Sequence, residues 1–182
     1  MRRLFVIVLA SSAAQAQPAP HRLPFTVEAG LGIGTVRVPG SFETTRFDTP
    51  LLGVHAGAAA WLTPHLALGA LFSGAGYDHA AADDRSNYRH GFVGSSAQYW
   101  LTDWLWLSGD AGLGLLDRKQ YGHAYQLHRG LAFDLRAGRS FAVGGPSHQL
   151  EVALDVMPSH YTIDGAIRNY QVVLVTLGYQ LL

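Results

Sequence analysis

The segment 148–157 reads His-Gln-Leu-Glu-Val-Ala-Leu-Asp-Val-Met, and it decides the fold class of this chain. Every second residue from Leu150 to Val156 is large and apolar, whereas the residues between them are Glu151, an alanine and Asp155. Side chains alternate across a β-strand, so this pattern predicts a strand with one apolar and one polar face. A helix would bring Glu151 and Asp155 together at a spacing of four residues, where like charges repel.

The same alternation recurs seven more times along the chain. The expected strands are 25–37, 52–62, 66–77, 91–101, 104–116, 127–141, 148–157 and 169–181. The chain has 21 glycines, and they concentrate on the less apolar faces of these segments. Small residues there suit the crowded interior of a narrow barrel. We therefore expect the apolar faces to point outward, although the facing stays open over 66–77 and 169–181.

Long polar connections alternate with short ones between the expected strands. The long connections are 38–50, 78–90, 117–127 and 157–168, and the short ones are 63–65, 102–103 and 144–147. A strict alternation places all long connections on one side of the sheet. This rhythm predicts an all-β, eight-stranded antiparallel transmembrane β-barrel with short periplasmic turns, longer extracellular loops and both termini in the periplasm.

The beginning of the chain has the features of an export signal. Two arginines precede a short apolar run, and small residues follow up to Ala16. This order predicts a signal peptide over residues 1–16. We expect a short periplasmic segment over 17–24 and the barrel over 25–182. The predicted location is the outer membrane of a Gram-negative-type cell.

Composition supports a membrane barrel and excludes several other classes of protein. Hydrophobic residues make up 48% of the chain and charged residues 14%, whereas about 25% charged residues are usual in a soluble domain. No apolar run approaches the length of a membrane-spanning helix. Cysteine is absent, so there is no disulfide framework. The formal net charge is zero and no basic cluster follows the signal, so nothing indicates a nucleic-acid partner.

The chain resembles the small eight-stranded outer-membrane barrels of the OmpA/OmpX type. The resemblance rests on the rhythm of hairpins and on residues 176–182, Thr-Leu-Gly-Tyr-Gln-Leu-Leu, which look like the C-terminal assembly signal of such proteins. The chain departs from that signal by ending in leucine instead of an aromatic residue. The resemblance implies outer-membrane lipids and lipopolysaccharide as surroundings and the barrel assembly machinery as a partner during insertion. The sequence leaves the oligomeric state open, and we expect a monomer.

Polar residues on the less apolar faces are expected to fill the lumen as a network of paired charges and hydrogen bonds. They are Glu28, His55, Asp110, Asp134, Arg136, Glu151 and Asp155. Basic residues in or beside the long connections are expected to contact lipopolysaccharide phosphates. They are Arg46, Arg85, Arg89, Arg118 and Lys119. We therefore expect a structural or surface-interaction role. The sequence leaves open whether the lumen conducts. It also leaves open whether the tryptophans point into the lumen or outward, as an aromatic girdle at the membrane interface.

Two other functions remain as alternatives. One is a lipid A-modifying outer-membrane enzyme, either an acyl hydrolase or an acyltransferase. Such an enzyme would use serine, histidine and carboxylate groups within hydrogen-bonding reach of one another. Two sets of such residues occur in the long connections: Ser159, His160 and Asp164, and Ser86, His90 and Asp84. A soluble lipocalin-like carrier would have the opposite facing, with the apolar residues inside.

Nothing in the sequence indicates a cofactor. The nine histidines are scattered and lack the spacing of a metal site. His79 lies near Asp78, Asp83 and Asp84 in the second long connection, and we interpret this group as solvated charge. The sequence therefore predicts no catalytic, cofactor or metal residues.

Overall fold

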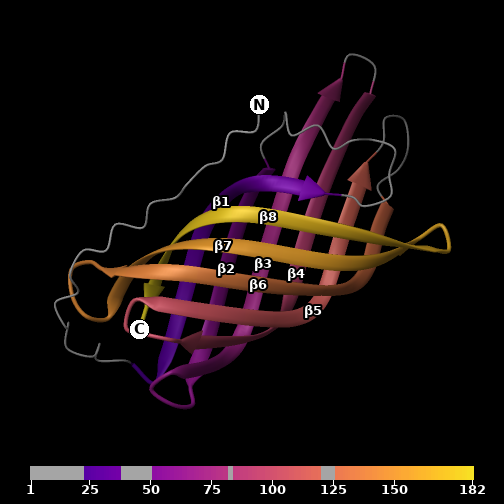
Figure 1. The fold of residues 1–182 in the computed structure, drawn as a ribbon. Helices are drawn as coiled ribbons and strands as arrows, with labels where there is room; N and C mark the ends of the chain where they lie inside the picture. Colours follow the sequence, from indigo (N-terminus) through magenta and orange to yellow (C-terminus); the bar gives the residue numbers. More distant parts are fainter. Residues whose placement is uncertain (1–22, 38–50, 82–83, 120–125) are drawn as a thin grey trace, which may run out of the picture.

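The computed structural model describes residues 23–37, 51–81, 84–119 and 126–182, and these residues form a closed β-barrel (Figure 1). The strands are β1 (Phe25–Arg37), β2 (Leu51–Trp61), β3 (Leu66–Ala81), β4 (Asp84–Trp100), β5 (Leu105–Lys119), β6 (Gln126–Ala142), β7 (His148–Ile163) and β8 (Ala166–Leu181). The described residues contain no helix of the length and apolar character needed to cross a membrane. The predicted signal at 1–16 lies outside the described residues.

The barrel closes because β1 pairs with both β2 and β8. Each strand is antiparallel to its neighbours, and the β1–β8 pair runs from Val27 opposite Leu181 to Arg37 opposite Gln171. Closure leaves no strand with a row of unpaired backbone groups at an open edge. The predicted fold class is therefore confirmed.

The apolar faces point outward around the barrel. Leu31 is 69% exposed, Leu131 53% and Leu177 60%, although each belongs to an apolar series within its strand. The facing of β3 and β8, which the sequence left open, is also settled: Phe72 and Tyr179 lie outside, and Leu71 and Gln180 lie inside. The inverted facing of a soluble carrier is not found in the described strands.

The long connections are shorter than predicted, because the strands continue into them. Most of 78–90 belongs to β3 and β4, and most of 157–168 belongs to β7 and β8. The ends of 117–127 belong to β5 and β6, while 38–50 lies outside the described residues. A backbone ladder needs only N–H and C=O groups, so polar side chains do not end it. Figure 1 shows the β3–β4 and β7–β8 hairpins extending away from the end that carries the C-terminus.

The short turns lie at the end that carries the C-terminus, and threonine hydroxyls stabilise two of them. The Oγ1 of Thr63 accepts hydrogen bonds from the backbone N–H groups of residues 65 and 66, and Thr102 does the same for residues 104 and 105. Hydroxyls commonly stabilise turns in this way. The repeated Trp-Leu-Thr sequence at 61–63 and 100–102 thus corresponds to a repeated turn.

Candidate functional site

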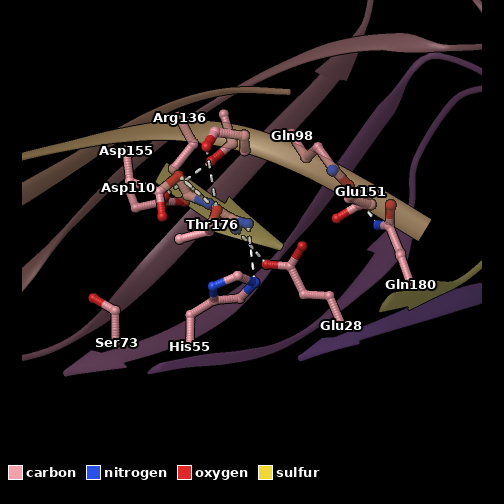
Figure 2. Close-up of polar contacts among 12 residues, drawn as sticks. Glu28, His55, Ser73, Gln98, Asp110, Arg136, Glu151, Asp155, Thr176 and Gln180 are labelled. Atoms are coloured by element: carbon pink, nitrogen blue, oxygen red, sulfur yellow. Dashed lines mark hydrogen bonds and ion pairs between the residues drawn. The ribbon is translucent and has the colours of Figure 1, made fainter. Parts of the chain in front are cut away.

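Arg136 on β6 is the centre of a polar network inside the barrel (Figure 2). Its Nη1 lies 2.6 Å from Oε1 of Glu28 on β1, and its Nε lies 3.4 Å from Oδ1 of Asp155 on β7. Its Nη2 is 3.2 Å from the ring nitrogen Nε2 of His55 on β2. The guanidinium also lies over the ring of Trp106 on β5, 5.0 Å from its centroid. One buried side chain therefore joins four other strands across the lumen.

The other polar residues expected in the lumen also point inward, and hydroxyl groups bond several of them. Ser108 donates to Asp110 over 2.9 Å, and Ser140 donates to Glu151 over 3.2 Å. The inward-pointing set is Glu28, His55, Asp110, Asp134, Arg136, Glu151 and Asp155. Its carboxylates outnumber its single arginine, so the neutral donors are needed to satisfy buried acceptors.

Tryptophans fill the lumen next to the short turns. Trp100 and Trp106 are fully buried, and Trp61 packs against them with its ring centroid 6.3 Å from that of Trp100. The indole N–H of Trp106 donates to Ser140 over 3.0 Å. Trp104 differs: it precedes the first residue of β5, does not follow the strand alternation, and is 40% exposed on the outside. The lumen therefore holds three of the tryptophans and the outer surface one.

A third group closes the lumen toward the extended hairpins. Tyr161 is fully buried and packs with Leu116, Ile163 and Tyr170. The ring of Tyr161 lies edge-on to that of His90, with centroids 6.0 Å apart. Aromatic and apolar side chains thus occupy the barrel at this end as tryptophans do at the other.

The serine and histidine residues considered for catalysis combine differently from either predicted set. Ser159 and His160 are neighbours in β7, so they point to opposite faces: Ser159 is fully buried, and His160 is exposed and bonds Asn169. Asp164 lies in the hairpin turn. The set Ser159, His160 and Asp164 is therefore not assembled.

Ser159 instead bonds His90, with Oγ and Nε2 2.7 Å apart. The other ring nitrogen of His90 is buried and has no hydrogen-bond partner among the described residues. A catalytic pair needs an accessible hydroxyl and a group that orients the histidine. Ser159 is fully buried, and no group that orients His90 is found among the described residues, so the contact is a link from β4 to β7 across the lumen. Of the second predicted set, the side chains of Asp84 and Ser86 lie outside the described part.

Free space in the polar layer is small. A cavity of about 10 Å³ is lined by Glu28, Gln98, Arg136, Gln180 and several small residues, which is about the space of one water molecule. The described residues also contain no group of three or more His, Asp and Glu side chains arranged to hold a metal ion. The side chains of Asp78, His79, Asp83 and Asp84 lie outside this description.

Four of the five basic residues expected to contact lipopolysaccharide belong to described strands, and they lie toward the extended hairpins. Arg89 on β4 is exposed and stands opposite Asp117 of β5. In the same pair of strands, the backbones of Arg118 and Lys119 stand opposite Tyr88 and Asn87. Arg85 lies four residues before Arg89 in β4. Arg46 lies outside the described residues.

Sequence reasoning missed a cationic and aromatic group on the outer surface near the short turns. The guanidinium of Arg139 lies over the rings of Trp104 and Phe141, at 4.9 and 5.1 Å from their centroids. The signal was present: Arg139 continues the outward series of Leu135 and Ala137 in β6. A charged residue in an outward apolar series is unusual.

No protein-family model matches this chain, and no curated protein matches it. Solved structures do match. Neisserial surface protein A is 14% identical with a TM-score of 0.61, and the match covers 87% of this chain and 97% of that chain. Ail, the attachment invasion locus protein of Yersinia pestis, solved with the heparin analogue sucrose octasulfate, is 14% identical with a TM-score of 0.53 and coverages of 86% and 97%. Likeness at this identity shows the fold, that of the small eight-stranded outer-membrane barrels.

Proposed function

Because the chain has the fold of the small eight-stranded outer-membrane barrels, we propose that it is an outer-membrane protein with a filled lumen that acts through its outer end. The supporting observation is the combination of an apolar exterior with a lumen filled at three levels. Such an exterior requires lipid around it. A lumen filled by side chains leaves the ends of the barrel, rather than its interior, to meet other molecules.

In this proposal, residues 1–16 direct export and are removed, and residues 176–182 are recognised by the barrel assembly machinery. The short turns and both termini face the periplasm. The extended β3–β4 and β7–β8 hairpins face the outside, where recognition residues usually lie. The protein is a monomer, since closure of the sheet satisfies its edges internally.

The outer end is proposed to contact lipopolysaccharide phosphates through Arg46, Arg85, Arg89, Arg118 and Lys119. Guanidinium groups pair well with phosphate, and the register brings β4 and β5 together at this end. Ail was solved with the heparin analogue sucrose octasulfate, which is also an anionic ligand. The proposal includes no enzymatic activity; it is supported by the burial of the Ser159–His90 pair, beside which the described residues place no orienting carboxylate.

The location is tested by membrane fractionation, followed by electrophoresis of boiled and unboiled protein in detergent. We expect the mature chain in the outer-membrane fraction, with a band whose mobility changes on boiling, because a closed barrel resists unfolding in detergent. A soluble periplasmic protein without such a shift would overturn the proposal.

The contact with lipopolysaccharide is tested by replacing Arg85 and Arg89 with glutamine. Each basic residue near an anionic membrane surface contributes about 1 kcal/mol, so the double variant should bind purified lipopolysaccharide about 30-fold more weakly. The control variant carries Pro64→Glu and His65→Glu, which change the net charge equally at the short-turn end. Equal affinity of both variants would remove the arginines from the proposal.

A further inference from the structure

Arg139 lies on the lipid-facing side of β6, surrounded by apolar residues. Its cross-strand neighbours are Leu105 on β5 and Val152 on β7, and Val152 is 44% exposed. Leu135 on the same face of β6 is 55% exposed. If the barrel is in a membrane, as proposed above, a cation here must reach toward a polar region, because charge in hydrocarbon is costly.

The side chain of Arg139 reaches toward the short-turn rim. Its guanidinium lies over Trp104, which directly precedes β5, and over Phe141, which is two residues nearer the end of β6. Trp104 is 40% and Phe141 45% exposed. Aromatic side chains of this kind mark the interface between hydrocarbon and headgroups. The charge of Arg139 is therefore held at the depth of lipid headgroups between two aromatic rings.

Arg139 has no anionic partner within the described part of the protein. The ion pairs found there all involve Arg136, and the Nε of Arg139 is buried without a hydrogen-bond acceptor. The two Nη groups of Arg139 are accessible and also have no hydrogen-bond acceptor among the described residues, so an acceptor from outside the protein can pair with them. At headgroup depth, the abundant anionic acceptor is phosphate, whose oxygens fit the fork of a guanidinium.

We propose that Arg139, Trp104 and Phe141 form a binding site for the phosphate of a phospholipid headgroup in the leaflet next to the short turns. Arg139 binds the phosphate oxygens. The two rings hold the guanidinium by cation–π contact and cover the upper part of the acyl chains. A phospholipid whose headgroup has no compensating positive charge is favoured, because its phosphate remains free to pair with the arginine.

The test uses the fluorescence of Trp104, since Trp61, Trp100 and Trp106 lie in the lumen. The full mature protein is folded into two kinds of phosphatidylcholine vesicle. One contains a small fraction of phosphatidylglycerol with a doxyl quencher near the headgroup. The other contains the same fraction of phosphatidylcholine with the same quencher. The ratio of quenching by the two labelled lipids reports local enrichment of the anionic lipid. We expect an enrichment of about fivefold, the usual effect of one basic residue at an anionic membrane surface.

The variant Arg139→Gln should reduce this ratio to about one. The matched control is Arg129→Gln, an exposed arginine ten residues earlier in β6 and near the opposite end, which should keep the wild-type ratio. Equal quenching by both lipids in the wild-type protein would overturn the site, as would an equal loss in both variants. Absence of quenching by either lipid would mean that the barrel is not in the membrane, and the proposed function itself would fail.

Discussion

Arg136 and the residues around it show how one side chain organises a narrow lumen. Its contacts reach Glu28, His55 and Asp155 on three different strands, and its guanidinium rests on Trp106. A buried arginine is tolerated because carboxylates compensate its charge. The buried carboxylates in turn need the arginine, because their negative charge also has to be compensated.

Replacing Arg136 with methionine should destabilise the barrel by about 3–5 kcal/mol, since it leaves Glu28 and Asp155 buried without their cation. The measurement is the urea midpoint at which the folded, faster-migrating band is lost. Arg129→Met, at an exposed position on the same strand, should leave the midpoint nearly unchanged. Adding Glu28→Gln to the Arg136 variant should recover part of the loss. A midpoint equal to that of the wild type would contradict the role of Arg136.

Gly138 is a second residue on which the lumen depends, because a Cβ at this position would collide with the ring of Trp106. Gly138→Ala should cost about 1–3 kcal/mol through overpacking, measured by the same urea midpoint. Gly109 on β5 is the matched control: its Cβ would meet only Leu135 Cδ2, at 3.9 Å. If both alanine variants had the same midpoint, the close approach of Trp106 would not limit stability.

The strands extend further than their side-chain pattern indicates. In the β7–β8 hairpin, Ile163 pairs with Ala166, so the turn consists of Asp164 and Gly165 alone. Their φ angles are 51° and 76°, as a tight two-residue hairpin turn of type I′ requires. The Asp-Gly dipeptide was visible in the sequence, and it is the signal that could have replaced the predicted loop 157–168 with a hairpin.

Gly165→Ala should therefore loosen the tip of this hairpin by about 1–2 kcal/mol, because a side chain with Cβ is strained at positive φ. Amide hydrogen exchange at the ends of β7 and β8 is the measurement, with faster exchange expected there and unchanged exchange near the short turns. Gly165→Asn is the control, since asparagine tolerates this conformation. Equal exchange in the alanine and asparagine variants would argue against the turn geometry.

The whole barrel is closed at three levels along its length. Tryptophans occupy the short-turn end, the Arg136 network occupies the middle, and Tyr161 with its neighbours occupies the end toward the extended hairpins. An eight-stranded barrel has an interior that side chains just fill. The Arg136 network rests on Trp106 of the first layer, whereas the Tyr161 group forms a separate cluster at the other end.

Purified protein in planar lipid bilayers should therefore show no stable conductance steps. The double variant Trp100→Ala and Trp106→Ala should also remain closed, because the Tyr161 group at the other end persists. It should unfold at lower urea concentration through the loss of buried aromatic surface. Stable conductance steps in the wild-type protein would contradict a filled lumen.

The alternation of side chains by itself determined the number of strands and the outward apolar faces of all but β3 and β8. This was possible because a strand has a period of two, and a lipid-facing wall makes one phase apolar wherever the strand crosses the membrane. Over 78–90 and 157–168 the outward positions no longer form an apolar series, so the pattern no longer distinguishes a strand from a loop.

Only the tertiary structure decided which inward residues meet. His90 with Ser159 and Arg136 with Glu28 are contacts between residues far apart in the chain and brought together across the lumen by closure. Closure also decided that Trp100 and Trp106 lie inside and that Trp104 lies outside beside Arg139. These contacts depend on the register of every strand pair around the barrel, and no local pattern of residues encodes the combined register of all the pairs.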